Sequence, residues 1–167
     1  GARLNECTQT GTNQFRILIR PENAPVNNSA WFAFKVSADQ TKTIEVTLAY
    51  ENGRHRYHPK VSRDGTNWKM LGANAYRHDK EKNEAILKFE VGPRPVWIAA
   101  QEMIGIAELT SWMNQLSKKT FIQKSLVGKS MEGRDIEQLQ IGNQSSSNYV
   151  FIIGRQHPPE VTGSLGL

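Results

Sequence analysis

The N-terminal part of the chain is dominated by short segments of β-branched and aromatic residues, separated by clusters of turn-forming residues. The clearest segment is 43–50, in which Ile44, Val46 and Leu48 alternate with polar residues. Successive side chains of a strand point to opposite faces, so this alternation predicts a strand with one buried face. Glu51-Asn-Gly53 follows directly and carries the Asn-Gly signature of a tight turn.

Similar segments recur along the N-terminal part of the chain at intervals of roughly 8–15 residues. They cover residues 15–20, 31–36, 55–62, 85–91 and 95–100. Short strands at such intervals, with turn chemistry between them, are typical of two packed antiparallel sheets. We therefore predict an N-terminal antiparallel β-sandwich domain over residues 1–101.

The pattern changes after residue 101. Ile106, Leu109, Met113 and Leu116 recur at helical spacing, which predicts a helix whose apolar stripe faces a core. Two strand-like segments, 121–127 and 135–141, follow on either side of the turn 128–134 and predict an antiparallel pair. Together with the run described next, this order predicts the opening part of an α/β, mixed-sheet domain over residues 102–167.

The run Val150 to Gly154 is wholly apolar up to its glycine, which predicts a strand buried on both faces. His157 and Glu160 follow it directly. An imidazole and a carboxylate are common zinc ligands, and open α/β sheets place their chemistry at the carboxyl ends of strands. Pro158 favours an extended His157, and proline is well tolerated in the first turn of a helix, so a helix is expected to hold Glu160 in its first turn.

Composition excludes several classes of protein. A hydrophobic content of 38% and a charged content of 22% place this 167-residue chain among globular proteins. The net charge is +5, but basic and acidic residues are interspersed, so no nucleic-acid partner is expected. No apolar run is long enough to span a membrane, and no signal-peptide pattern opens the chain. The single cysteine, Cys7, excludes an internal disulfide framework.

Three segments carry a resemblance to a known family. The run from Gly154 to Ser164, Gly-Arg-Gln-His-Pro-Pro-Glu-Val-Thr-Gly-Ser, resembles the first metal motif of the M14 zinc carboxypeptidases, in their cytosolic-carboxypeptidase-like branch. Gly128-Lys-Ser-Met-Glu-Gly-Arg134 resembles the turn that opens the catalytic domain of that family. Residues 31–36 and 57–68 resemble the β-sandwich that precedes the catalytic domain in this branch.

The resemblance implies a zinc-dependent enzyme that hydrolyses the C-terminal peptide bond of peptides or proteins. It implies that His157 and Glu160 bind Zn²⁺ together with a second histidine, and that a glutamate acts as general base. Neither of these two further residues has a counterpart in the sequence, so both are expected beyond Leu167. None of His55, His58 and His78 is expected to complete the site. The chain alone is therefore expected to be inactive and to bind zinc weakly.

The motif departs from the digestive members of the family, which have an arginine immediately before the metal glutamate. Pro159 stands at that position here, as proline or glycine does in the branch that the chain resembles. Arg155 lies on the other side of His157 and is a weaker candidate for contacting the substrate. Arg134 is expected to anchor its own turn by pairing with a carboxylate or a carbonyl.

Two alternatives stay open at this point. One is an amidase or deacylase on the same zinc scaffold, because the residues that set specificity would lie downstream. The other is a non-catalytic β-sandwich binding module, in which Trp31, Trp68 and Trp97 contact a ligand. The branch implies a cytoplasmic enzyme, whereas a removed signal peptide would imply a periplasmic or secreted one. The sequence does not predict the oligomeric state.

Overall fold

The computed structural model describes residues 4–21, 31–157 and 160–166. The chain divides into two compact units, Gly1–Met103 with Arg155–Leu167, and Ile104–Gly154. In the described part of the chain, no helix has the length and apolar character needed to cross a membrane.

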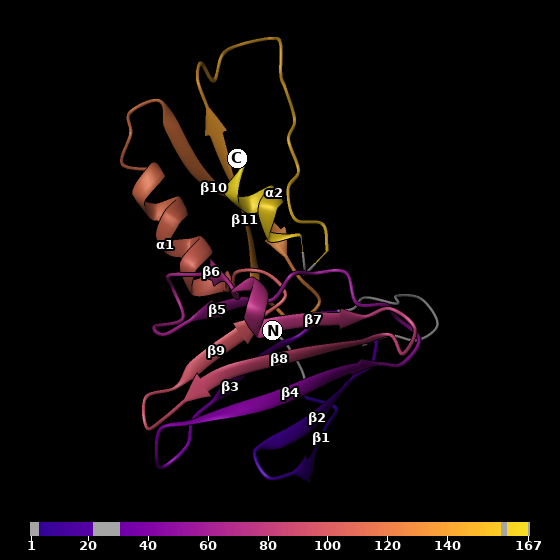
Figure 1. The fold of residues 1–167 in the computed structure, drawn as a ribbon. Helices are drawn as coiled ribbons and strands as arrows, with labels where there is room; N and C mark the ends of the chain where they lie inside the picture. Colours follow the sequence, from indigo (N-terminus) through magenta and orange to yellow (C-terminus); the bar gives the residue numbers. More distant parts are fainter. Residues whose placement is uncertain (1–3, 22–30, 158–159, 167) are drawn as a thin grey trace. The chain divides into compact units, whose positions relative to one another are not determined.

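Two sheets form the first unit (Figure 1). The larger sheet has the strand order β1–β2–β4–β8–β7, with bounds Glu6–Gly11 (β1), Gln14–Ile19 (β2), Lys42–Tyr50 (β4), Glu84–Val91 (β8) and Tyr76–Asp79 (β7). The smaller sheet has the order β3–β9–β5–β6, with bounds Ala33–Val36, Val96–Ala99, Lys60–Ser62 and Lys69–Met70. A single 3₁₀ turn, η1 (Ala73–Ala75), precedes β7.

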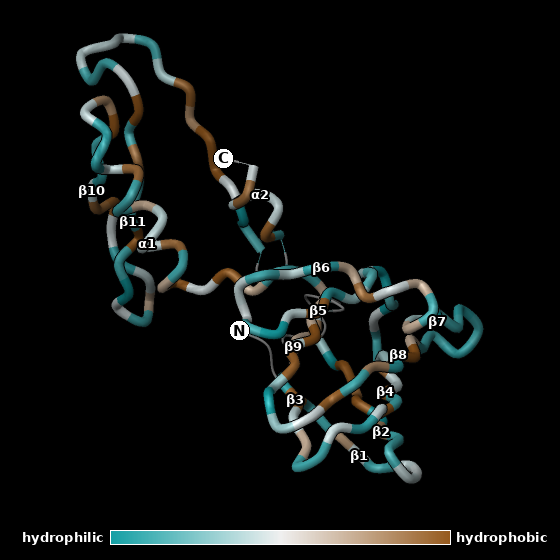
Figure 2. The backbone as a smooth tube through the Cα atoms, turned by 60° about the vertical axis from the view of Figure 1, so that its left-hand side comes forward, coloured by the Kyte–Doolittle hydropathy of each residue, from teal (hydrophilic) through white to brown (hydrophobic). Residues whose placement is uncertain are grey.

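The core of this unit is built from residues of both sheets, which confirms the predicted sandwich. Ile44, Val46 and Leu48 of β4 are all buried, as their alternation predicts. Val46 pairs with Leu87 on the neighbouring strand β8, and Leu87 is fully buried. Figure 2 shows apolar residues along β4, β8 and β9. Residues of these three strands belong to the buried core.

One strand pair departs from a purely antiparallel sandwich, because β2 and β4 run parallel. Parallel neighbours need a crossover connection, and β3 of the other sheet lies in the connection between them. The larger sheet is therefore mixed, while the described pairs of the smaller sheet are all antiparallel.

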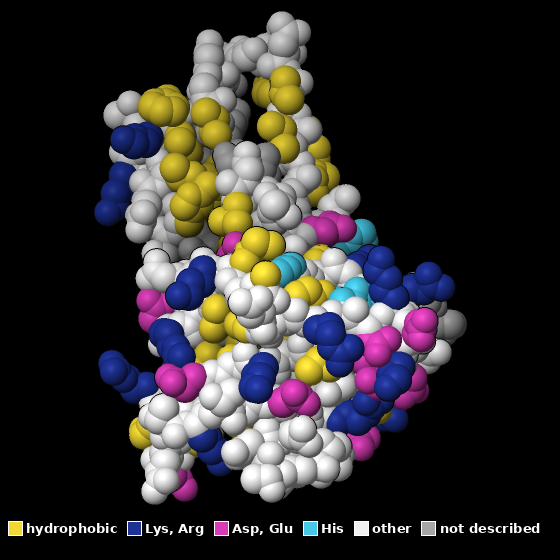
Figure 3. Space-filling view, in the orientation of Figure 1, with side chains coloured by type: hydrophobic (Ala, Val, Ile, Leu, Met, Phe, Trp, Pro, Cys, Tyr) yellow, Lys and Arg dark blue, Asp and Glu magenta, His cyan; other side chains and the backbone are white. Residues whose placement is uncertain are grey.

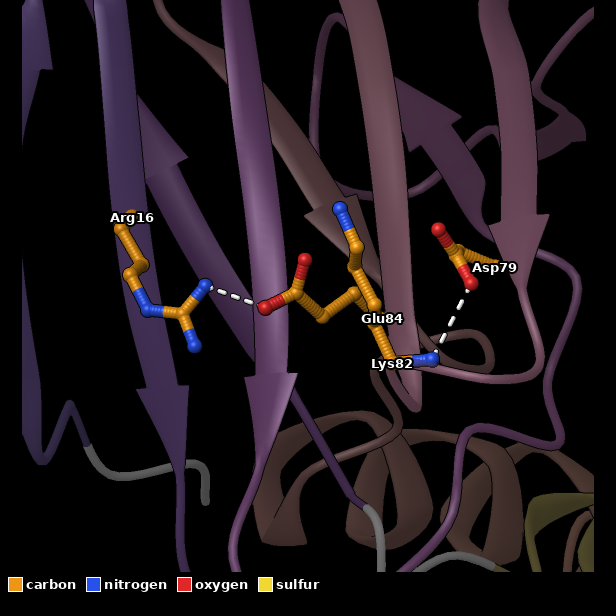
Figure 4. A network of polar contacts seen from close by, with 4 residues as sticks. All are labelled: Arg16, Asp79, Lys82 and Glu84. Carbon is orange, nitrogen blue, oxygen red and sulfur yellow. Dashed lines mark hydrogen bonds and ion pairs between the residues drawn. The ribbon is translucent and has the colours of Figure 1, made fainter.

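Strand β7 lies at one edge of the larger sheet and contains the charged residues Arg77 and Asp79. Figure 4 shows how polar contacts hold this region. Arg16 of β2 forms an ion pair with Glu84 at the start of β8 (2.5 Å). The backbone N–H of Lys82 donates to Asp79 Oδ1 (3.1 Å) and closes the turn between β7 and β8. Charged residues are well tolerated on an edge strand such as β7.

The second unit contains one helix and one hairpin, α1 (Ile106–Leu116), β10 (Ile122–Lys129) and β11 (Asp135–Ile141). The helix and the antiparallel pair confirm the predictions for these segments. The Glu108 carboxylate accepts a hydrogen bond from the Gly105 N–H (2.8 Å), which caps the start of the helix. Lys124 of β10 donates to Asn114 Oδ1 (2.7 Å) and ties the hairpin to the helix.

Two burial predictions for this unit were wrong. Of the helical stripe only Met113 is buried, while Ile106 remains 62% exposed. Residues Val150 to Gly154 form no strand, and Val150 is 89% exposed. A strand buried on both faces needs neighbours on each side, and no described strand pairs with this run. Figure 3 shows apolar side chains gathered on the surface of this second unit.

We expect the exposed run to cause self-association of the chain. Phe151 and Ile152 are 82% and 63% exposed within an unpaired extended segment, which is a template for strand pairing between molecules. Substitution Phe151→Lys should raise the concentration at which light scattering detects association. Leu4→Lys, which makes the same change at an exposed residue outside the run, should leave that concentration unchanged. Equal effects of the two substitutions would contradict this account.

Candidate metal centre

The pair predicted to bind metal lies at the start of the last helix, α2 (Val161–Leu165). Glu160 is the residue that caps this helix, and its carbonyl accepts a hydrogen bond from the Gly163 N–H (3.0 Å). The Glu160 N–H in turn donates to the His157 carbonyl (3.1 Å). The predicted helix therefore exists but begins one residue after Glu160. Pro158 and Pro159 lie outside the described residues, so their predicted roles stay predictions.

The two side chains point toward each other. His157 Nδ1 lies 2.8 Å from Glu160 Oε1, and the His157 backbone N–H donates to Glu160 Oε2 (3.2 Å). Both side chains are accessible, with 64% of His157 and 52% of Glu160 exposed. The hydrogen bond from His157 lowers the pKa of Glu160, so its carboxylate is ionised at neutral pH. Ionised carboxylate is the form that binds a metal.

These donors fit part of a zinc site. Zinc bound to an imidazole nitrogen and a carboxylate oxygen in tetrahedral geometry separates the two atoms by about 3.4 Å. The observed 2.8 Å is shorter because the two groups hydrogen-bond directly. Among the described residues, no group of three or more His, Cys, Asp or Glu is arranged to hold a metal ion. Catalytic zinc typically has three protein ligands, so this pair alone would not complete such a site.

The two arginines named from the sequence lie in different units of the chain. Arg155 has a left-handed backbone conformation (φ 51°), which is uncommon for a residue with a side chain. Arg134 Nη2 pairs with Glu132 Oε2 (2.5 Å) inside its own turn. Gly133 in that turn has φ 76°, a conformation that glycine adopts without strain.

The three remaining histidines lie together in the sandwich, a grouping that sequence reasoning missed. His55 and His78 contact each other edge to face, with ring centroids 4.8 Å apart. Both ring nitrogens of His55 are already hydrogen-bonded to tyrosine hydroxyls, so they have no lone pair directed at a metal. The spacing His55-x-x-His58 was visible in the sequence, but nothing there indicated that His78 would join them.

Comparison with known proteins agrees with the fold and the order of the two domains. The zinc carboxypeptidase family, Peptidase_M14, matches residues 109–167. The cytosolic carboxypeptidase N-terminal domain matches residues 2–100. The chain has the architecture of a metallopeptidase with an N-terminal β-sandwich. It belongs to the M14 zinc carboxypeptidases that carry a cytosolic carboxypeptidase N-terminal domain.

Solved structures share this fold at low sequence identity. A metallo-carboxypeptidase from Burkholderia cenocepacia has a TM-score of 0.73 at 20% identity, over 96% of this chain and 42% of that one. A metallo-carboxypeptidase from Pseudomonas aeruginosa, solved in complex with (2-guanidinoethylmercapto)succinic acid, has a TM-score of 0.65 at 20% identity. That match covers 84% of this chain and 38% of that one, so the chain spans about two fifths of such relatives. No curated protein matches the chain significantly.

Proposed function

We propose that the chain is part of a zinc-dependent metallocarboxypeptidase that removes the C-terminal residue of peptides or proteins. Residues 1–101 would form its N-terminal domain and residues 102–167 the opening part of its catalytic domain. The observation that carries this proposal is the convergence of His157 Nδ1 and Glu160 Oε1, 2.8 Å apart, within the segment that the zinc carboxypeptidase family matches.

In this proposal His157 and Glu160 hold the zinc ion. When bound, zinc polarises the scissile carbonyl and lowers the pKa of water toward roughly 7, so that hydroxide is available at neutral pH. Glu160 is ionised before metal arrives, because its pKa is already lowered by His157. The exposure of both side chains leaves the metal face open to a substrate. The third ligand and the general-base glutamate would lie beyond Leu167.

Recognition of the substrate would rest on positive charge near the metal pair, because a carboxypeptidase must bind a free carboxylate. Arg155 is two residues from His157 and is the weaker candidate named from the sequence. A guanidinium binds a carboxylate through two parallel hydrogen bonds, which suits it to this task. Peptide C-termini are thus the proposed partners.

An amidase or deacylase on the same scaffold remains the second candidate, since it would use the same metal pair. The full-length protein should be assayed on peptides ending in Glu, Lys or Phe and on N-acyl amino acids bearing the same residues. The proposal expects faster release of the terminal residue from the peptides. Turnover confined to the N-acyl amino acids would show that the enzyme is an amidase. The proposed metal ligands would stay the same.

The binding-module alternative makes a different prediction about the sandwich. Trp97 lies on β9 and has Lys35 over its ring at 5.6 Å, and the Trp68 indole N–H donates to the Gly65 carbonyl (3.0 Å). Both indoles thus have contacts within the fold that account for their positions. Saturable binding of any peptide or glycan from a panel at Trp68 or Trp97 would favour the binding-module alternative.

A further inference from the structure

A cluster of aromatic and imidazole side chains lies in the sandwich, apart from the metal pair. Its centre is His55, which follows β4 and is only 6% exposed. Tyr50 of β4 and Tyr76 of β7 contact it from two strands, and His78 of β7 and His58 complete the cluster. The proposed peptidase uses none of these residues.

His55 joins two elements through both of its ring nitrogens. Nδ1 lies 2.7 Å from the Tyr50 hydroxyl, and Nε2 lies 2.7 Å from the Tyr76 hydroxyl. A neutral imidazole has one N–H and one lone pair, so it donates to one tyrosine and accepts from the other. Phe32 stacks against the ring with centroids 6.3 Å apart, so an apolar group covers it as well.

The backbone of the same segment is held by Asn83, in the turn between β7 and β8. The His55 N–H donates to Asn83 Oδ1 (3.2 Å), and Asn83 Nδ2 donates to the Gly53 carbonyl (2.7 Å). Asn83 has φ 55°, in the left-handed region that asparagine tolerates better than most residues. Two side chains thus attach the segment 51–58 to the β7–β8 hairpin. His55 of the segment bonds to Tyr76 of the hairpin, and Asn83 of the hairpin bonds to the backbone of the segment.

The charged groups around His55 offer no counter-charge for an added proton. His78 and His58 are imidazoles, and His58 Nε2–H donates to the Leu71 carbonyl (2.7 Å). The nearby carboxylates have other partners, since Glu51 pairs with Arg20 and Asp79 accepts from Lys82. Among the described residues, no ion pair joins His55 to a carboxylate. Of the other charged groups on these elements, Glu84 pairs with Arg16, and no described ion pair joins Glu81 or Glu90 to His55. The rest are cationic: Arg54, Arg56 (over the Tyr57 ring), Arg77, Lys80, Lys82 and Lys88.

We propose that His55 is a pH-sensitive latch, which holds the segment 51–58 on the β7–β8 hairpin while it is neutral and releases it when it gains a proton. Protonation would place a positive charge among two tyrosines, a phenylalanine and two further imidazoles. Release restores water to the imidazolium and frees the Tyr50 and Tyr76 hydroxyls from it. The cluster therefore couples proton concentration to the attachment of segment 51–58 to the hairpin.

The titration of His55 has the sign that this latch needs. Burial, followed by the proximity of His78 and His58, lowers the pKa of His55 from 6.5 to about 4. Burial raises the pKa of Tyr50 and of Tyr76, so both hydroxyls stay protonated. The fastened state therefore binds fewer protons than the released state. Its stability is complete above pH 6.5 and is lost as the pH falls toward 4.

Hydrogen exchange of the 167-residue chain measures the latch directly. Between pH 7.5 and 5.0, after correction for intrinsic exchange rates, the opening equilibrium of segments 51–58 and 76–83 should rise about 30-fold. At pH 7.5 these segments should already open more readily than strand β8. Exchange of the two segments only together with β8 would overturn the latch, because His55 would then affect global stability alone.

Two variants distinguish the latch from a general effect of low pH on the stability of the fold. In His55→Gln, an amide that does not titrate replaces the imidazole, and the opening equilibrium should become independent of pH over this range. In His78→Gln the neighbouring imidazole is removed, so the rise should be smaller but still present. An NMR titration of the unmodified chain is independent of whether either variant folds. A pKa of His55 at or above 6 in that titration would contradict the proposal.

Discussion

Replacing His157 by alanine in the full-length protein is expected to reduce peptidase activity by more than 100-fold. Loss of a residue that only orients a metal ligand costs roughly 10- to 100-fold, and loss of a ligand itself should cost more. Glu160→Gln should have a similar effect, because a neutral amide binds zinc less well than an ionised carboxylate. Zinc content of the purified variants should fall together with activity.

A matched control shows whether the loss is local. Glu81→Gln makes the same chemical change at an exposed carboxylate in the β7–β8 turn, outside the metal motif. It should retain both zinc and activity. If His157→Ala and Glu160→Gln kept full zinc content, the assignment of these residues as ligands would be wrong, whatever the activity.

Leu87→Ala is expected to cost the sandwich about 2–5 kcal/mol of unfolding free energy. Leu87 is fully buried, pairs with Val46 across the sheet and belongs to the core shared by both sheets. The substitution removes its contacts and leaves a cavity that close-packed neighbours fill only in part. A domain of this size has about 5–15 kcal/mol of stability, so the loss is a large share.

The measurement needs a probe that reports the sandwich alone. Trp112 lies on α1 in the second unit, whereas Trp31, Trp68 and Trp97 lie in the first. Urea unfolding followed by tryptophan fluorescence in a Trp112→Phe background therefore follows the sandwich. Met70→Ala removes a side chain that is 62% exposed and should change the midpoint little. A Leu87→Ala effect as small as that of Met70→Ala would show that the core is packed differently.

The strands of the sandwich were predicted where a segment has one apolar and one polar face. Strand β4 is such a case, and its alternation identified both its existence and its buried face. Strand β1 (Glu6–Gly11) was missed because it lies at a sheet edge and has no buried residue. Periodicity carries no information about which strands pair, so the parallel β2–β4 pair followed only from the structure.

In the second unit, the sequence predicted the elements but not their burial. Helix α1 was predicted, and strand β11 was predicted at its observed bounds, because helical spacing and short apolar alternation are local signals. The burial expected for Ile106 and for the run 150–154 was wrong. Burial depends on what packs against a segment, and the described residues provide no layer over these side chains.

The candidate metal site was predicted in part. The types and spacing of His157 and Glu160 predict a metal pair, and the resemblance to a family implies that the metal is zinc. The structure adds that Nδ1, not Nε2, faces the glutamate. The His55 cluster was not predicted, because its members come from three separate segments that only folding brings together.

Crystals of the full-length protein, grown with zinc and measured at the zinc absorption edge, test the central claim most directly. The account predicts an anomalous difference peak about 2.1 Å from His157 Nδ1 and from a Glu160 carboxylate oxygen. A third protein ligand should complete the coordination from a residue beyond Leu167. A zinc peak bound by other residues, with His157 and Glu160 still hydrogen-bonded to each other, would contradict it.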